Sequence, residues 1–234
     1  MNINIEVGSG YYFSNFNNQD YIRRDLSEYT TDCYFDNHDL LSTNMYKVSY
    51  AIKPEIYLVG QKLSLITGLR YTRYSVDTDN DDFWDVGESF YVRVPGKGLN
   101  TDYYRVRNID QDAHYLGIPL EVKFSPSGPR AFRMHLKLGA EVGYLIYSYT
   151  DVRFKNSSMR RYIDSVRDVI GEPRKVNAAA YAAVGFRAGR EHRPGFLFEL
   201  TLPTFYLTKD QNLLAEPLWG FGIQLGMSIP LNKE

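Results

Sequence analysis

The carboxylates between Asp77 and Glu88 have the spacing of a calcium-binding loop. They occupy positions one, three, five, nine and twelve of the segment DTDNDDFWDVGE, where such loops place their oxygen ligands. The sixth position, however, is Asp82 instead of the glycine that the sharp turn requires. The flanking segments have strand and loop character. We therefore interpret the segment as a solvated acidic loop tip, with calcium binding as the alternative.

The four histidines offer little further chemistry. No pair among His38, His114, His135 and His192 has the spacing of zinc ligands. A lipid hydrolase built on a serine and His135 is conceivable, but the chain has no GxSxG nucleophile motif. We interpret His135 as a hydrogen-bonded interior residue. We therefore expect no catalytic residue, no metal site and no cofactor, so that the protein is not an enzyme.

A third group of ionisable residues lies on the polar side of segments that alternate between apolar and polar positions. Its charges are balanced, so they can pair with one another inside a barrel, where buried charges must be paired and hydrogen-bonded. This predicted interior charge cluster consists of Lys53, Glu55, Arg70, Glu121, Lys123, His135, Lys137, Glu141, Arg187 and Glu199.

The alternation that places these charges is clearest in residues 132–146. Every second residue from Phe132 to Ile146 is apolar or alanine, and the residues between them are charged or glycine up to Gly143. Successive side chains of a strand point to opposite faces, and a tilted membrane-spanning strand needs about nine to eleven residues. Similar β-rich segments recur along the chain. The eight predicted strands are Ile3–Phe13, Tyr46–Val59, Lys62–Val76, His114–Phe124, Phe132–Tyr149, Val176–Ala188, Phe196–Leu207 and Leu218–Leu231.

The connections between these strands alternate in length. Short turns rich in glycine and proline join strands two and three, four and five, and six and seven. The other connections are long, about residues 14–45, 78–113, 150–175 and 208–217. Short turns at one end and long loops at the other are typical of outer-membrane barrels. In the third long loop, apolar residues at helical spacing predict a short helix, started by Ser157 or Ser158 and stopped by Gly171 and Pro173.

The apolar face of such a barrel can point to lipid or, as in a soluble lipocalin-like carrier, to the interior. Two features besides the balanced charges favour lipid. The polar face is rich in glycine, which leaves room inside a narrow barrel. Aromatic residues gather toward strand ends, as in the girdles at membrane interfaces. These aromatic residues are Tyr46, Tyr71, Tyr74, Tyr144, Tyr147, Phe205, Tyr206, Trp219 and Phe221.

Bulk composition agrees with this interpretation. The formal net charge of −1 argues against a nucleic-acid partner. No apolar run is long enough for a transmembrane helix, and mean hydropathy is −0.39, as a barrel with a polar interior and polar loops allows. Residues Met1–Ile5 lack the basic and apolar regions of a signal peptide, and we expect that one has been cleaved. The single Cys33 forms no internal disulfide.

Three segments resemble a known family. LSLITGLRYTRY at Leu63–Tyr74, HYLGIPLEVKF at His114–Phe124 and LKLGAEVGY at Leu136–Tyr144 are similar to strands of outer-membrane β-barrel domain proteins of the OmpA-like, PorT-like type of Gram-negative bacteria. The resemblance spans nearly the whole chain and concerns strand architecture. It implies an outer-membrane location. The chain departs from the family by ending on Lys233 and Glu234 instead of an aromatic residue.

We therefore predict one all-β domain over residues 1–234, an eight-stranded antiparallel up-and-down transmembrane β-barrel. An interior of this width is filled by side chains, so we expect no open pore. The predicted role is non-enzymatic, structural or through the long loops, or as an accessory subunit of an envelope complex. Expected partners are outer-membrane lipid, lipopolysaccharide and other envelope proteins. A narrow porin-like channel for small solutes and a soluble carrier of a hydrophobic ligand remain the alternatives.

Overall fold

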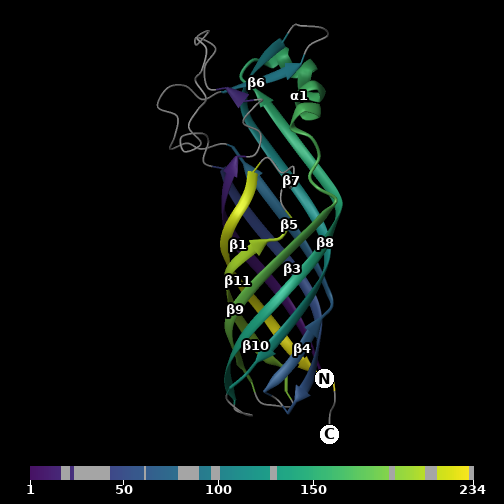
Figure 1. Cartoon of the computed structure of the whole chain (residues 1–234), viewed down its shortest axis with the longest axis vertical. Coiled ribbons are helices and arrows are strands. Elements are labelled where there is room, and N and C mark those ends of the chain that lie inside the picture. Colours follow the sequence, from purple (N-terminus) through teal and green to yellow (C-terminus); the bar gives the residue numbers. More distant parts are fainter. Residues whose placement is uncertain are drawn as a thin grey trace.

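The wall of the molecule is a ring of antiparallel strands that follow one another in chain order (Figure 1). The computed structural model describes residues 1–16, 22–23, 43–60, 62–78, 90–95, 101–126, 131–189, 193–208 and 215–231. The wall strands are β1 (Asn2–Phe16), β3 (Thr43–Val59), β4 (Leu63–Thr67), β5 (Leu69–Asp77), β7 (Thr101–Phe124), β8 (Phe132–Phe154), β9 (Val176–Ala188), β10 (Gly195–Tyr206) and β11 (Ala215–Pro230).

Pairing between the first and last strands closes the ring. Asn2 lies opposite Pro230 and Phe16 opposite Ala215, with one register shift between them. Only Gly68 separates β4 from β5, and a Cβ there would lie 2.2 Å from the Ile52 carbonyl oxygen. With β4 and β5 counted as one wall strand, the described residues form an eight-stranded up-and-down barrel, as predicted.

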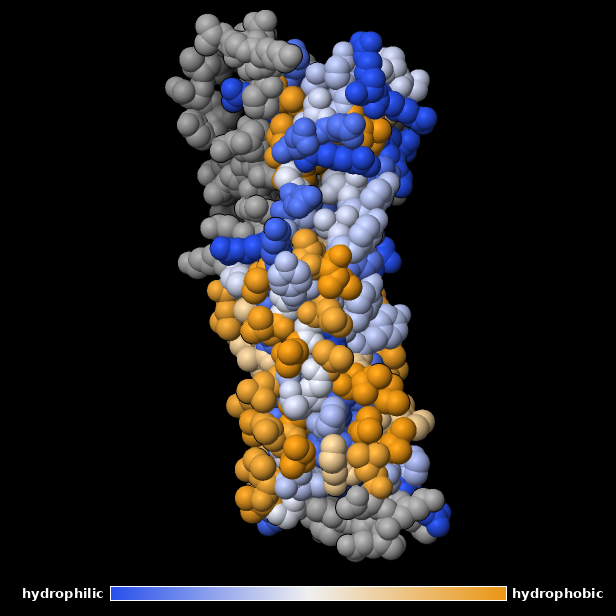
Figure 2. Space-filling view, turned by 90° about the vertical axis from the view of Figure 1, so that its right-hand side faces the viewer, coloured by the Kyte–Doolittle hydropathy of each residue, from blue (hydrophilic) through white to orange (hydrophobic). Residues whose placement is uncertain are grey.

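The barrel has its apolar face outside. Leu138 is 68% exposed and Ile118 61%, whereas Lys53 and Glu121 are 0% exposed. Figure 2 shows the outward apolar side chains as a broad band on the face of the barrel wall turned to the viewer, with mostly hydrophilic residues above it. A soluble carrier would have the opposite arrangement. The fold is therefore a transmembrane β-barrel whose outer face suits lipid.

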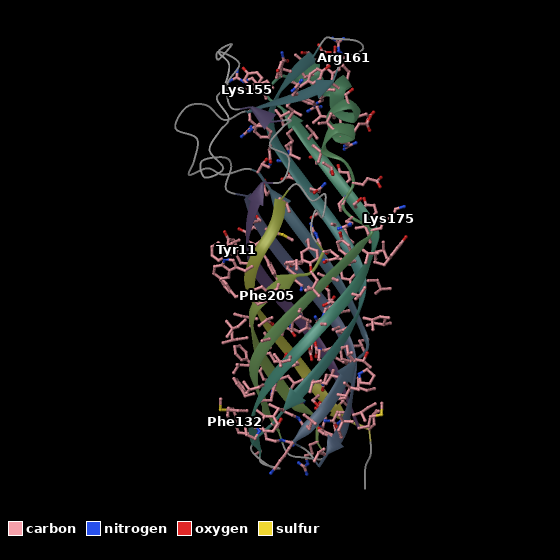
Figure 3. All side chains as sticks on the ribbon, viewed as in Figure 1. Tyr11, Phe132, Lys155, Arg161, Lys175 and Phe205 are labelled. Atoms are coloured by element: carbon pink, nitrogen blue, oxygen red, sulfur yellow. The ribbon has the colours of Figure 1, made fainter. Side chains whose placement is uncertain are left out.

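Aromatic side chains flank the apolar band. Near the long-loop end, Trp219 stacks on Phe13 with ring centroids 4.5 Å apart. Near the short-turn end, Phe186 stacks between Phe132 and Phe198, at 5.1 Å from each. Figure 3 shows Tyr11 and Phe205 projecting from the wall well above Phe132. Of the residues predicted for the girdle, six are exposed: Tyr46, Tyr144, Tyr147, Phe205, Trp219 and Phe221.

Two of the predicted girdle residues instead point into the barrel. Tyr74 is 3% exposed because it lies four residues after Arg70 on β5 and therefore shares the inward face with it. Tyr206 follows a register shift between Leu202 and Thr204, which changes the face that later residues present. Its ring lies 6.1 Å from that of Tyr74. The prediction of both tyrosines at the membrane interface is therefore wrong.

Several predicted loops contain secondary structure. Residues 78–113 include β6 (Phe90–Pro95) and the first thirteen residues of β7, and residues 150–175 include the end of β8. β1 and β3 extend into residues 14–45, where β2 (Ile22–Arg23) also lies, and β11 begins before residue 217. At 24 and 23 residues, β7 and β8 are about twice the length that a membrane requires. Both therefore rise beyond the apolar band.

The part above the band forms a small unit that we call the head. It comprises β2, β6, residues 101–113 of β7, residues 148–154 of β8, the 3₁₀ helix η2 (Ser157–Tyr162) and the helix α1 (Ile163–Ile170). The predicted helix is confirmed as η2 followed by α1. Asn156 caps η2, accepting a hydrogen bond from the Ser158 amide at 3.1 Å, and no side chain caps the start of α1. Gly171, with φ 79°, follows its end. Among the described residues, no helix is long and apolar enough to cross a membrane.

The head has an apolar core that is continuous with the tyrosines at the top of the barrel interior. Val166 and Ile170 of α1 are buried, and they belong to one cluster with residues from β6, β7 and β8. The strand contributions include Phe90, Val92, Val94, Val106, Ile109 and Val152. In the head, therefore, the apolar strand face points inward, opposite to its direction in the membrane.

Candidate functional site

Glu121 on β7 is the centre of the charged interior. Its side chain is fully buried, and Lys53 Nζ donates to its two carboxylate oxygens at 2.9 and 2.8 Å. Arg70 Nη2 donates at 2.9 Å, and Lys137 Nζ lies 3.2 Å away. The Tyr181 hydroxyl also donates to this carboxylate. Strands β3, β5 and β8 thus each bring one cation to a single carboxylate.

Each of these cations has a second carboxylate. Lys53 Nζ lies 2.5 Å from Glu6 Oε2. Arg70 Nη1 donates to Glu141 Oε2 at 2.6 Å and to the Tyr181 hydroxyl at 3.1 Å. Because charges alternate in sign across the barrel, every buried charge in this part of the network has an opposite neighbour, which is the condition for tolerating it.

The third cation extends the network toward β10. Lys137 forms an ion pair with Glu199, and His135 Nε2 lies 2.9 Å from the other oxygen of the same carboxylate. His135 is 2% exposed. Its place in the structure is that of the hydrogen-bonded interior residue predicted from the sequence.

A separate pair lies nearer the short-turn end. Lys123 forms an ion pair with Glu55. Ser64 donates to Glu55 at 2.7 Å and the Asn4 amide donates at 3.1 Å. All four side chains are buried. This pair therefore blocks the interior independently of the Glu121 network.

The interior holds all ten residues of the predicted charge cluster. Nine are buried and Glu141 is 11% exposed. The one member that belongs to neither of the two groups above is Arg187. It lies close to the short-turn end, and its guanidinium donates to the Arg193 carbonyl at 3.3 Å. The structure thus brings together residues from six wall strands that are distant in sequence.

Three members of the interior were not singled out from the sequence. Glu6 shares the inward face of β1 with Asn4 and Gly8, and Lys47 shares a face with Lys53 on β3. The same two-residue spacing that identified the other charges would have found them. Tyr181 was hidden among the alanines of β9. A Cβ at Gly139 would lie 2.8 Å from the Tyr181 ring, so the glycine makes room for the tyrosine.

Tyrosines fill the barrel between the charges and the head. Tyr12, Tyr74 and Tyr206 pack edge to face, with centroids 5.7 to 6.4 Å apart, and Tyr115 lies 5.7 Å from Tyr74. Lys47 Nζ lies over the Tyr12 and Tyr74 rings, 5.8 and 5.6 Å from their centroids. A cavity beside Lys47 has space for about one or two water molecules. At this level, therefore, tyrosine rings and Lys47 occupy the barrel interior and leave a small cavity beside them.

An acidic row crosses the base of the head, beyond the apolar band. Asp110 on β7 lies opposite Asp77 on β5 and Asp151 on β8. Partial burial, together with the neighbouring Asp77 carboxyl, raises the pKa of Asp110 to about 6, against the opposing effect of Arg153. Arg153 Nη2 lies 3.2 Å from Asp110 Oδ2.

The acidic segment Asp77–Glu88, for which calcium binding was the alternative interpretation, lies mainly outside the described residues, as do His38, His192 and most of residues 14–45. Within the part of the chain that the structure describes, no group of three metal-binding side chains is close enough to hold a metal ion. Arg167, in the third predicted loop, contacts two neighbouring residues. Its Nε donates to the Thr150 carbonyl at 2.7 Å and its guanidinium lies over the Tyr149 ring.

A closed antiparallel ring with lipid-facing apolar residues and a charged interior is the arrangement of outer-membrane barrels. A family model described as "Outer membrane protein beta-barrel domain" matches residues 1–232. The chain belongs to this family. It is therefore an outer-membrane β-barrel of the type expected from its strand motifs. No curated protein matches the chain.

Among solved structures, the barrel is similar to the N-terminal β-barrel domain of OprF from Pseudomonas aeruginosa. The two share 10% sequence identity, the alignment covers 97% of each chain, and the TM-score is 0.34.

Proposed function

We propose that this protein is a non-enzymatic, closed outer-membrane barrel that holds its head at the cell surface for interaction with other envelope molecules. The observation that carries this proposal is the filled interior. From the short-turn end toward the head, the Lys123–Glu55 pair, the Glu121 network and the tyrosine layer occupy successive levels. A barrel so filled acts as a rigid support.

The head supports the same proposal. β7 and β8 extend it well beyond the apolar band, and α1 closes an apolar core against them. A strand hairpin used only to cross the membrane would need neither this extra length nor an apolar cluster above the membrane. Because the start of β1 and the end of β11 lie at the short-turn end (Figure 1), we place that end in the periplasm and the head outside the cell.

We propose that lipopolysaccharide surrounds the base of the head and contacts its exposed cations. Lys175 lies above the level of Tyr11 and projects away from the barrel (Figure 3), and Arg174 beside it is exposed. Cations just above an aromatic girdle are well placed for the phosphate groups of lipid head groups. An accessory role in an envelope complex would use the same exposed head.

Single-channel recording in planar bilayers tests the closed barrel. The refolded protein should give no discrete conductance steps at neutral pH. A variant that loses one side chain from each of these three levels, with Glu121, Glu55 and Tyr74 replaced by alanine, should conduct if it still shows the gel shift of a folded barrel. Regular conductance steps from the unmodified protein would overturn the proposal in favour of a narrow channel.

A further inference from the structure

Strand β7 changes its neighbour where the barrel passes into the head. Up to Asp110 it pairs with β5, whose last residue, Asp77, lies opposite Asp110. Residues 101–106 of β7 pair instead with β6, which lies above β5 in Figure 1. On its other side, β7 stays paired with β8 from Phe124 up to Val106. The end of β5 therefore marks the junction between the barrel and the head.

Thr78 joins the end of β5 to β7. Its backbone amide donates to the Ile109 carbonyl at 3.3 Å, and its hydroxyl oxygen accepts from the Ile109 amide at 2.8 Å. The hydroxyl itself donates to the side-chain carbonyl of Asn108 at 2.9 Å. The amide group of Asn108 in turn donates to the Asp110 carboxylate at 3.1 Å. A chain of hydrogen bonds thus connects this carboxylate with the bonds that hold β5 against β7.

The acidic row lies on the outer face of this junction. Asp77 on β5, Asp110 on β7 and Asp151 on β8 are directly opposite one another. Like charges in opposite positions of an antiparallel pair repel. Arg153 Nη2 lies 3.2 Å from Asp110 and its Nε lies 3.4 Å from Asp151. These two contacts lie between β7 and β8, whereas Asp77 and Asp110 face each other across β5 and β7.

We propose that Asp77 and Asp110 form a pH-sensitive latch between the barrel and the head. When one of the two carboxyls carries a proton, it donates to the other, and the pair joins β5 to β7. When both are ionised, they repel each other, and the hydrogen bonds of Thr78 open more often. Because β8 stays paired with β7, the head then remains attached but moves more freely on the barrel.

The surroundings of Asp110 set the pH at which the latch changes. Partial burial raises the pKa of Asp110, and a hydrogen bond with Asp77 together with its charge raises the pKa further, to about 6. Arg153 and Asn108 act in the opposite direction. Because the folded pKa is raised, protonation stabilises the junction, and this stabilisation is lost as pH rises from about 4 to 6. The latch is therefore tighter in mildly acidic medium than at neutral pH.

The charged groups around Asp110 agree with this direction. Among the described residues, the charged side chains that face it from the adjoining strands are Asp77, Asp151 and Arg153. On β7 itself, the next acidic residue of the outer face is Asp112, and both of its carboxylate oxygens accept from Arg73, at 3.1 and 2.7 Å. Asp110 thus has more negative than positive charge facing it, which favours its protonated form.

This inference adds regulation to the proposed function, and it rests on that proposal because the head is there the part that meets other envelope molecules. With the head outside the cell, the carboxyls of the latch are in contact with the external medium. A change in the pH of that medium would then alter how rigidly the barrel presents the head.

Site-resolved amide hydrogen exchange of the full-length protein in detergent micelles, at pH 5 and pH 7, tests the inference. The measured quantity is the protection factor of the Thr78 and Ile109 amides, which corrects for the pH dependence of chemical exchange itself. With a pKa of about 6 for Asp110 in the closed latch and about 4 in the open one, protection should fall about tenfold between the two pH values. Protection along β1 and β11 should not fall in parallel.

Asp77→Asn is the test variant, because it keeps the size of the side chain and removes one of the two facing carboxyls. Protection of both amides should then change by no more than about twofold between pH 5 and pH 7. Asp112→Asn is the matched control. It also removes a carboxylate from the outer face of the wall, but one that is paired with Arg73, so the tenfold change should remain.

The inference is overturned if protection of Thr78 and Ile109 is the same at both pH values, or if Asp77→Asn keeps the tenfold change. It is also overturned if β1 and β11 lose protection by the same factor, since the loosening would then concern the whole barrel. None of these results would refute the closed barrel of the proposed function, whereas conductance steps would refute that proposal and leave the latch untouched.

Discussion

Replacing Glu121 by glutamine should reveal how strongly the interior network holds the barrel together. The substitution keeps the size of the side chain but removes the charge shared by Lys53, Arg70 and Lys137. Breaking a buried ion pair by removing one partner costs about 3–5 kcal/mol. Each of the three cations keeps one other carboxylate, so we expect a loss in this range instead of three times as much.

Urea unfolding of the protein in lipid vesicles, followed by heat-modifiable migration on a gel, measures the loss. The control is the ion pair between Arg73 and Asp112. The distance from Nη2 to Oδ2 is 2.7 Å, but the Arg73 side chain is 48% exposed and that of Asp112 is 24% exposed. Asp112→Asn should cost at most about 1 kcal/mol. If Glu121→Gln changes the free energy of unfolding by less than about 1 kcal/mol, the interior is solvated and the account of a filled barrel is wrong.

Three further predictions concern packing, pH and the head. Gly220→Ala should destabilise the barrel by about 1–3 kcal/mol, because its Cβ would lie 2.3 Å from the Tyr12 ring; urea unfolding measures this. The Asp110 carboxyl should titrate near pH 6 in a carbon NMR titration, and since its folded pKa is raised, its contribution to stability should fall as pH rises from about 4 to 6. Asp77→Asn should move that titration down. Ile170→Ala should cost about 2–5 kcal/mol of head stability, read as faster amide exchange in the head.

The substitutions at Gly220 and Ile170 each have a matched control. At Gly143 the nearest atom to an added Cβ is 3.3 Å away, so Gly143→Ala should cost clearly less than the first substitution. Asp164 on α1 is 93% exposed, and its replacement by alanine should leave amide exchange in the core of the head unchanged. Equal effects of variant and control would contradict the packing on which the prediction rests. An ordinary aspartate titration at position 110 would contradict the acidic row.

The eight wall strands could be predicted because one physical rule governs their sequence. Because lipid lies outside and packed charges lie inside, apolar and polar residues must alternate along each wall strand. For example, the predicted strand Val176–Ala188 begins and ends at the same residues as β9. The rule also placed the ten interior charges, since a charge on a lipid-facing position would be costly. It did not show which charges pair, because pairing depends on register between strands.

The head was harder to predict because the rule reverses there. Val106, Ile109 and Val152 point into the head core, and the residues between them include arginine and aspartate. Because no lipid surrounds the head, the outer side of its strands is polar and faces water. The resulting mixture of polar and apolar residues predicts a loop instead of strands. The register shift between Val106 and Asn108 also breaks the two-residue period. Tyr206 was misplaced for a similar reason, since a register shift is not visible in the sequence.

Fluorescence quenching of Trp219 by brominated lipid tests the central claim, that the apolar face of this barrel contacts lipid. The chain has two tryptophans, and Trp84→Phe leaves Trp219, which is 48% exposed on the outer wall. In vesicles of lipids with brominated acyl chains, its emission should be quenched, most strongly when the bromines are near the interface. Unquenched emission at the wavelength of a tryptophan in water, from a folded protein, would contradict the account.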